Sequence, residues 1–429
     1  MALTFPRPLA VITVAALLLG ACSAGKKAAN PGAAVTITWW TGQAEDAEKI
    51  LEGLAAEYHT AHPNVTIKVS SGAPTTDDLL TKLSAAFVGG TYPDISYAYG
   101  SWATQLAQSG RTQDLSTEVA DPKRAWQEFP PAARATATVD GKVIGLPAVV
   151  DNLGIVYNRK LFDQAKVAYP TDDWTWDDFR AAARKLTDRS TNVYGTAYPV
   201  SGSENTTWVL WPLLWQRGGA ILAQDGKAPA FDSDAGVQAL TFLRDLAVTD
   251  KSVYLDQTDE KFGPLFLDGR VAMLITGPWQ LYDITQRKLD YGVAFLPGTN
   301  GDHQTISGPD LWTLFDHDDP DRAAAAREFV FWLTSKDVDT RYSLAQGNLP
   351  LRDSEKSTAA YRDFTKQYPG ATTFVENLAN ARQPRPTVPG YVELSQYVGE
   401  AISQVMQGAA DPRQALDAAA RKSREALAQ

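Results

Sequence analysis

The stretch Val35-Thr36-Ile37-Thr38-Trp39-Trp40 is rich in β-branched and aromatic residues and predicts a strand. Apolar residues then recur at helical spacing over Glu45–Tyr58 and alternate over Val65–Val69, as in a second strand. A second amphipathic helix over Leu79–Phe87 and a third strand over Tyr92–Tyr97 follow. This β-α-β-α-β order predicts an α/β fold with an open, largely parallel sheet covered by helices on both faces.

Two loops of this predicted sheet are candidates for a binding site. Ligands of open α/β sheets bind beyond the carboxyl ends of the strands. The segments Trp40–Gln43 and Tyr97–Ser101 follow the first and third predicted strands. We therefore expect these two loops to line the rim of a ligand site.

A second compact unit is predicted to start near Val149. It contains a strand over Leu153–Asn158 and a further strand over Tyr291–Leu296. Between them, Trp174–Leu186 reads as a helix that Thr175 opens as N-cap, with acidic residues in its first turn. The length of 429 residues fits two domains better than one.

The N-terminus carries a targeting signal. An apolar run over Leu9–Leu19 is too short for a bilayer, which takes about 20 residues, and predicts a signal peptide. The sequence Leu19-Gly20-Ala21-Cys22 resembles the bacterial lipobox, whose cysteine is diacylated and becomes the mature N-terminus. We expect a signal peptide over 1–22, lipidation of Cys22 and a flexible tether over 23–34. An ordinary secretory signal with a cysteine near its cleavage site is the alternative.

Composition excludes several classes of protein. Cys22 is the only cysteine, so the mature chain beyond it has no side chain for a disulfide, a zinc cluster or a thiol nucleophile. The net charge of -10 disfavours nucleic acid as a partner, because nucleic-acid sites need a basic surface. We expect no metal and no cofactor. Signatures of nucleotide, serine-hydrolase and zinc-protease sites are absent from the sequence.

Four stretches carry a resemblance to a known family through their order and spacing. The chain resembles the extracellular solute-binding proteins of bacterial ABC importers, in the sugar-binding branch similar to maltose-binding protein. The four stretches are Tyr92-Pro93-Asp94-Ile95 with Leu106–Gly110, Val139–Pro147 with Val156–Leu161, Phe266–Met273 with Gly277-Pro278-Trp279, and Tyr291-Gly292-Val293 with Leu296-Pro297-Gly298.

The resemblance implies a two-lobed, periplasmic-binding-protein-like α/β fold with the ligand in a cleft between the lobes and a hinge that the chain crosses more than once. One lobe would hold 35–148 and 306–343, and the other 149–305 and 344–429. It implies a monomer that captures a mono- or oligosaccharide by lobe closure and delivers it to ABC permease subunits. With the predicted anchor, the protein would sit on the extracellular face of the cell membrane, or in the periplasm of a bacterium with an outer membrane.

Candidate ligand contacts combine aromatic surfaces with polar groups, because a sugar presents apolar C–H faces and a rim of hydroxyls. By the resemblance, Trp279 and Trp208 align with aromatic positions of the cleft, and Asp151 with a carboxylate that, when ionised, would accept hydroxyl hydrogen bonds. Core packing is the alternative for each tryptophan. The further candidates from the same loops are Trp40, Gln43, Tyr99, Ser101, Asn152, Gly308, Asp310, Arg385 and Tyr391.

Three other functions remain open from the sequence. Where maltose-binding protein has Asp-Lys after its first strand this chain has Gln43-Ala44, so the sugar need not be maltose. The same fold binds glycerophosphodiesters or peptides in some relatives, and an anionic ligand would need cations such as Arg385. A secreted glycoside hydrolase needs only two suitably placed carboxylates, and 50 acidic residues supply many pairs.

Overall fold

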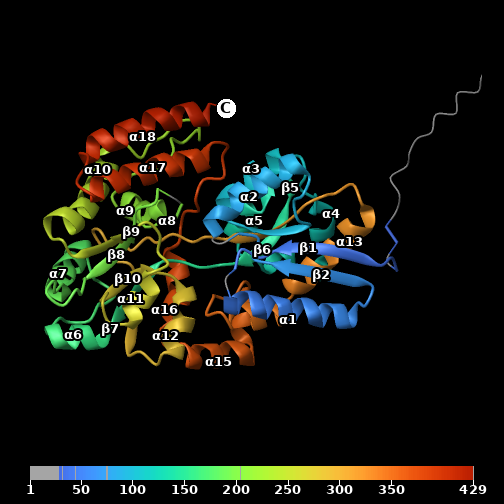
Figure 1. Cartoon of the computed structure of the whole chain (residues 1–429), viewed down its shortest axis with the longest axis horizontal. Coiled ribbons are helices and arrows are strands. Elements are labelled where there is room, and N and C mark those ends of the chain that lie inside the picture. The colour runs from blue at the N-terminus through green and yellow to red at the C-terminus, as the bar shows by residue number, and fades with distance from the viewer. Residues whose placement is uncertain (1–28, 31, 44, 74–75, 203, 429) are drawn as a thin grey trace, which may run out of the picture.

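The computed structural model describes residues 29–30, 32–43, 45–73, 76–202 and 204–428. They form two lobes of helices and sheets, one mainly from the blue and teal part of the chain and the other from green, yellow and red segments (Figure 1). The predicted signal peptide and Cys22 lie outside the described residues. Among the described helices, none combines the length and apolar character that crossing a bilayer requires.

The first lobe is built on a five-stranded sheet. Its strands, in spatial order, are β2 (Val65–Ser70), β1 (Val35–Trp40), β3 (Ile95–Ala98), β12 (Asp310–Leu314) and β6 (Gly145–Val149). β1 pairs in parallel with β2 and β3, whereas β12 is antiparallel to both β3 and β6. Four of the five strands therefore run in the same direction, as expected for a largely parallel sheet, and β12 is the antiparallel exception because it enters from a distant segment rather than through a β-α-β crossover.

Helices from both ends of the chain cover this sheet. α1 (Glu45–Ala61) packs beside β2, and α13 (Pro320–Leu333), from the later part of the chain, packs against β1 (Figure 1). α2 (Thr76–Gly89) lies between β2 and β3 in the sequence. α13 starts where proline suits the first helical turn, and the Asp319 carboxylate caps it by accepting from the N–H groups of Asp321 and Arg322.

The second lobe contains a three-stranded sheet and a parallel two-stranded pair. In the first, β7 (Gly154–Asn158) lies between β10 (Met273–Thr276) and β11 (Tyr291–Ala294) and is antiparallel to both. The pair is β8 (Thr196–Pro199) with β9 (Val253–Asp256). β10 ends opposite Gly154 and β11 ends opposite Ile155, so the segments after them leave the sheet where the chain enters from the first lobe.

The helices of the second lobe include one whose start the sequence predicted. α7 (Trp176–Leu186) begins with a capping box in which Thr175 and Asp178 each bond the backbone N–H of the other. Near the C-terminus, α17 (Tyr391–Met406) and α18 (Pro412–Leu427) pack side by side on the outside of the lobe (Figure 1).

The remaining elements are short. The hairpin strands are β4 (Thr138–Val139) and β5 (Lys142–Val143). The other α-helices are α3 (Ala103–Gln108), α4 (Ser116–Val119), α5 (Pro131–Thr136), α6 (Arg159–Ala165), α8 (Glu204–Trp208), α9 (Leu210–Trp215), α10 (Asp234–Arg244), α11 (Phe262–Leu267), α12 (Leu281–Gln286), α14 (Lys336–Ser343), α15 (Ala359–Gln367) and α16 (Ala371–Asn377). The 3-10 helices are η1 (Gly100–Trp102), η2 (Pro122–Arg124), η3 (Trp126–Glu128), η5 (Pro278–Gln280), η6 (Asp353–Ser357) and η7 (Leu378–Asn380). η4 (Asp245–Thr249) is a short π-helix.

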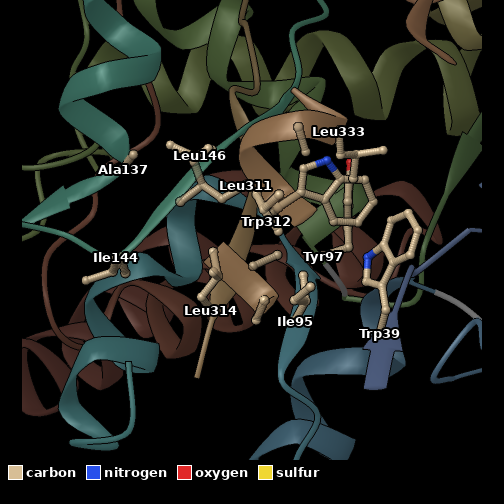
Figure 2. Packing of buried hydrophobic residues seen from close by; sticks show 14 of the residues in the cluster. Trp39, Ile95, Tyr97, Ala137, Ile144, Leu146, Leu311, Trp312, Leu314 and Leu333 are labelled. Carbon is tan, nitrogen blue, oxygen red and sulfur yellow. The ribbon is translucent and has the colours of Figure 1, made fainter. Parts of the chain in front are cut away.

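The core of the first lobe is centred on an aromatic cluster that β12 completes. The ring of Trp312 meets Trp39 edge-on at 5.0 Å and Tyr97 at 5.4 Å between ring centroids (Figure 2). Such edge-to-face pairs add about 0.5–1.5 kcal/mol beyond the burial of their area. Two further apolar clusters lie within the described part of the second lobe, around β7 with α17 and around β10 with α16. The lobe boundaries written from the sequence stay a prediction, but Leu351, which they place in the second lobe, packs in the core of the first, and Arg352 stacks on Phe129 there.

Candidate functional site

A buried arginine joins several of the predicted site residues. Arg385 lies in an irregular segment between Pro384 and Pro386, and proline disfavours a helix for itself and for the residue before it. Its side chain is 4% exposed. The guanidinium is held between Glu204, whose Oε1 lies 3.1 Å from Nη1, and Asp310, whose Oδ1 lies 3.4 Å from Nη2. Burial alone would lower the pKa of Arg385, but attraction to these two carboxylates outweighs it and raises the pKa.

Two aromatic rings flank the same guanidinium. The Arg385 guanidinium carbon lies 4.1 Å from the ring centre of Trp208 and 5.4 Å from that of Tyr99. Trp208 comes from α8 in the second lobe, whereas Tyr99 immediately precedes η1 in the first. Cation–π contacts of this kind are worth about 2 kcal/mol or more where water is excluded. Arg385 therefore links the two lobes.

Close approach of the hinge backbone to this cluster depends on a glycine. A Cβ atom at Gly308 would come within 2.2 Å of the Trp208 ring and 2.9 Å of Arg385 Nη2. Any larger residue would force these side chains apart. The predicted site residue Gly308 thus lies directly against Trp208 and Arg385.

Asp310 is positioned where β12 begins. The ladder between β12 and β6 is irregular at Asp310 and Leu311, and such irregularities re-aim side chains. The Asp310 carboxylate accepts hydrogen bonds from the Tyr97 hydroxyl at 2.5 Å and from the Gly100 N–H at 3.4 Å. Burial raises the pKa of Asp310 to about 6, although Arg385 and the Tyr97 hydroxyl favour its ionised form.

Asp151 lies against the backbone of Gly308. Its Oδ1 accepts the backbone N–H of Gly308 at 3.0 Å, which ties the first hinge crossing to the second. Burial and repulsion from Asp310 raise the pKa of Asp151 to about 8. The raised pKa favours the protonated carboxyl, which can donate a hydrogen bond, and the ionised acceptor that the resemblance implies stays a prediction.

Glu204 organises the second-lobe side of the cluster and was missed by the sequence analysis. Besides Arg385, it accepts hydrogen bonds from the Tyr391 hydroxyl at 3.1 Å and the Ser395 hydroxyl at 2.6 Å. The Tyr391 oxygen in turn accepts the indole N–H of Trp211 at 3.2 Å. Tyr391 is therefore brought to the cluster through Glu204. The sequence did offer a signal for Glu204. It lies four residues before Trp208, so both side chains lie on one face of the same helix.

Two buried polar groups at this place have no partner in the structure. The indole Nε1 of Trp208 and the hydroxyl of Ser101 are both shielded from solvent and make no hydrogen bond. Leaving a buried donor unpaired costs about 1–3 kcal/mol, and such groups call for an explanation in each structure. They are available to the hydroxyl groups of a ligand.

Other predicted residues lie in different surroundings. Asn152 is fully buried, and its amide donates to the Phe374 carbonyl and accepts from Asn377, both at 2.8 Å. These bonds give Asn152 a structural role in the hinge. Trp40 lies at the end of β1 beneath Lys82, whose ammonium nitrogen is 4.7 Å from its ring centre, and Gln43 follows in the loop after β1.

Trp279 lies in η5, just after β10, and is 40% exposed. It is one of three large apolar side chains that the structure exposes among its described residues. Its ring covers Gly277, where a Cβ atom would come within 1.9 Å of it. β10 ends opposite the start of β7, close to the first hinge crossing. Trp279 therefore presents an aromatic face at that end of the sheet.

The cluster is closed by direct contacts between the lobes. The Thr104 hydroxyl in α3 donates to the Thr387 carbonyl, beside the Arg385 contacts. Cavities of about 990 and 420 Å³ lie elsewhere and are lined by none of the predicted site residues. A ligand that reaches Arg385 and Trp208 must therefore separate the lobes or displace these side chains. No group of three or more metal-binding side chains is found within the described ranges.

Comparison with known proteins gives the family. The family model of the bacterial extracellular solute-binding protein matches residues 53–373. An uncharacterized lipoprotein of Streptomyces antibioticus is 27% identical over 397 residues, which are 89% of this chain and 84% of the relative.

Two solved structures are similar over nearly the whole fold. An ABC substrate-binding protein from Listeria monocytogenes in complex with cycloalternan has a TM-score of 0.82 and 25% identity, and the match covers 92% of this chain and 99% of that one. The cyclic α-maltosyl-1,6-maltose binding protein from Arthrobacter globiformis has a TM-score of 0.75 and 27% identity with the same coverage. The resemblance seen in the sequence is confirmed, and the chain belongs to the bacterial extracellular solute-binding protein family.

Proposed function

We propose that this protein is the lipid-anchored extracellular receptor of an ABC sugar importer and that it captures a neutral oligosaccharide by closing its two lobes. The observation that carries the proposal is the cluster of Trp208, Tyr99 and Arg385, which brings aromatic faces from both lobes together beside unpaired donors. Aromatic faces suit the C–H faces of sugar rings, and the unpaired donors suit their hydroxyls.

The charges of the cluster favour a neutral ligand. Arg385 is the central cation, and its charge is already balanced by Glu204 and Asp310. A phosphate or peptide carboxylate would have to compete with these carboxylates for the guanidinium. The ligands of the similar Listeria and Arthrobacter proteins, cycloalternan and cyclic α-maltosyl-1,6-maltose, support an oligosaccharide rather than a glycerophosphodiester or a peptide.

Binding and delivery follow from lobe closure. A ligand favours the closed form only by the difference between its affinities for the closed and open forms. Contacts from Tyr99 on one lobe and Trp208 on the other supply such a difference, because an open form cannot make both. The permease would then release the unchanged sugar, which makes the protein a receptor and no enzyme.

The test is thermal unfolding of the purified protein with linear and cyclic oligosaccharides, glycerophosphocholine and short peptides. A ligand at 100 times its dissociation constant stabilises the native state by about 2.7 kcal/mol. We expect a selective shift with one class of neutral oligosaccharide, which is recovered intact by chromatography. A shift with glycerophosphocholine or peptides alone would contradict the proposal, and consumption of the sugar would identify a hydrolase.

The lipid anchor is proposed on the lipobox at Cys22 and on the similarity to the Streptomyces lipoprotein. We expect the native protein to partition with membranes and its N-terminal peptide to carry diacylglycerol, as mass spectrometry would show. The Cys22→Ser variant should appear in the soluble extracellular fraction. Equal membrane association of both forms would contradict the anchor.

A further inference from the structure

The larger cavity of the protein lies apart from the candidate sugar site. It has a volume of about 990 Å³ and is formed in the first lobe by the end of α1, the start of β2, η2, α13 and the first turn of α14. Its aromatic wall consists of Tyr58, Phe331 and Trp332, of which Tyr58 and Trp332 have ring centroids 5.1 Å apart. A volume of this size is typical of small-molecule sites, which range over about 300–1,000 Å³.

Charged side chains of both signs line this cavity, and within the described chain two of its lysines are unpaired. Among the described residues, neither Lys123 nor Lys336 has a carboxylate partner for its side chain. Of the acids in the cavity wall, Glu328 pairs with Arg124 at 2.6 Å, Asp321 accepts the N–H of Asn30, and Glu128 accepts the Ser354 hydroxyl. Asp337 is attracted to Arg341. Lys123 and Lys336 are therefore free to pair with an anion, beside the carboxylates of Asp321 and Glu128, which keep their negative charge.

The N-terminus of α14 opens into the same cavity without a side-chain cap. Ser335 occupies the N-cap position, but its hydroxyl donates to the Trp332 carbonyl at 2.6 Å and leaves the first N–H groups of α14 uncapped. Ser335 and Lys336 both line the cavity. Uncapped N–H groups and the positive end of the helix dipole attract anions.

A buried arginine supplies a second, independent indication of a ligand. Arg352 lines the cavity, is 4% exposed, and its Nε has no hydrogen-bond partner in the structure. Its guanidinium carbon stacks 4.0 Å from the ring centre of Phe129, and Nη1 lies 3.5 Å from a Glu355 oxygen. The free Nε–H can donate one further hydrogen bond, although an anion there would share the guanidinium with the Glu355 carboxylate.

We propose that this cavity binds an anionic amphiphile, a molecule with one acyl-like apolar chain and a phosphate or carboxylate head. The apolar chain packs on Tyr58, Phe331 and Trp332, and the head lies between the start of α14, Lys336 and Arg352. This site is independent of the proposed sugar site, because the two share no residue.

The position of the cavity agrees with a lipid-derived ligand. Ala29 lines the cavity, and the predicted anchor Cys22 precedes it by seven residues. Seven extended residues span at most about 25 Å, so a protein anchored at Cys22 would hold the cavity close to the membrane surface.

The test is calorimetric titration of the full protein with three probes of the same chain length, each below its micelle concentration. They are dodecyl phosphate, dodecylammonium and octaethylene glycol dodecyl ether, with negative, positive and neutral heads. We expect one molecule of dodecyl phosphate per protein and at least tenfold weaker binding of the other two. Equal affinity for all three heads would overturn the proposal. The same titration with lysophosphatidylglycerol in place of dodecyl phosphate distinguishes a lipid headgroup from a free alkyl phosphate.

Variants localise the site. Lys336→Glu should weaken dodecyl phosphate about tenfold, and Ala325→Trp, which fills the cavity from α13, should abolish binding. Lys227→Glu reverses the charge of an exposed lysine outside the cavity, and this variant should bind dodecyl phosphate like the wild type. Unchanged binding in Lys336→Glu would refute the site even if Ala325→Trp failed to fold. Oligosaccharide stabilisation should persist in every folded variant, which separates this proposal from the sugar-binding one.

Discussion

Arg385 at the lobe junction and Arg352 in the first lobe are both buried beside carboxylates, but their surroundings differ. Arg385 bonds Glu204 and Asp310 and touches rings from both lobes. Arg352 pairs with Glu355, next to Asp339, and stacks on Phe129 within one lobe. The Arg352 group leaves Arg352 Nε, Asp339 Oδ2 and Glu355 Oε2 without partners, whereas no atom of Arg385, Glu204 or Asp310 is left so.

Both clusters contain more carboxylates than cations, and in each of them burial and the neighbouring carboxylate raise the pKa of one acid. At the lobe junction, burial raises the pKa of Asp151 to about 8. In the first lobe, burial and repulsion from Asp339 raise the pKa of Glu355 to about 9. The comparison indicates that buried charge alone does not mark the candidate sugar site in this protein. Contact with aromatic rings from both lobes is what distinguishes the Arg385 cluster.

The largest expected effects come from removing each arginine. Arg385→Met and Arg352→Met each leave carboxylates buried without their cation, which costs about 3–5 kcal/mol of stability. Denaturant unfolding would measure the loss. Only Arg385→Met should also abolish stabilisation by the cognate oligosaccharide. If Arg352→Met abolished it too, or Arg385→Met retained it, the distinction between the clusters would be wrong.

A smaller effect separates the hinge from the ligand site. Asn152→Ala leaves the Phe374 carbonyl and an Asn377 N–H unpaired. We expect a loss of about 1–3 kcal/mol in unfolding free energy with unchanged sugar affinity. Asn152→Asp keeps the size and the acceptor for Asn377 but loses the donor to the Phe374 carbonyl, so it should be destabilised as well. Reduced sugar affinity in a stable Asn152→Ala protein would return Asn152 to the ligand contacts.

Replacing the two acids whose pKa is raised tests the proton balance of the clusters. Because the folded pKa of Asp151 is raised above its usual 3.8, its contribution to stability is present below that value and lost as pH rises towards about 8. For Glu355 the loss extends from 4.5 to about 9. Each loss has a slope of at most about 1.4 kcal/mol per pH unit.

Asp151→Asn and Glu355→Gln cannot titrate, so each should flatten the fall in stability over its own window. Unfolding curves at pH 5, 7 and 9 would show this. The stability of each variant relative to the wild type should therefore increase with pH. This increase should stop near pH 8 for Asp151→Asn and near pH 9 for Glu355→Gln. A variant whose stability follows the wild-type pH profile would show that its acid is ionised in the native state.

The smallest change in stability is expected for Trp279→Ala, because the ring is already 40% exposed. Surface substitutions usually alter unfolding free energy by about 0.5 kcal/mol or less. If Trp279 stacks on the sugar, affinity should nevertheless fall about tenfold, corresponding to about 1.4 kcal/mol. Tyr169→Ala, which removes another exposed ring, is the control and should leave affinity unchanged. Equal affinities in both variants would remove Trp279 from the site.

Local patterns predicted the parts of the fold that depend on neighbours in sequence. The alternation over Val65–Val69 and the helical spacing over Glu45–Tyr58 match β2 and α1, and Thr175 caps α7 as expected. The antiparallel entry of β12 was not predictable in this way, because it depends on pairing between distant segments.

The same division holds for the candidate site. Residue type and resemblance nominated Tyr99, Trp208, Gly308, Asp310 and Arg385, which the structure brings together. Glu204 was missed because its role depends on partners up to 191 positions away in the chain. The raised pKa of Asp151 was also out of reach, since burial and a neighbouring charge cause it.

The insertion of β12 between β3 and β6 has a consequence for how the protein folds. The first lobe cannot close its central sheet until the ribosome has added Asp310–Leu314, after most of the second lobe has been made. Until then β3 and β6 lack the strand that joins them, and Trp39 lacks its contact with Trp312. Such distant pairing slows folding and keeps the growing chain extended for longer. A late central strand thus favours folding after the whole chain has been released over folding during its synthesis.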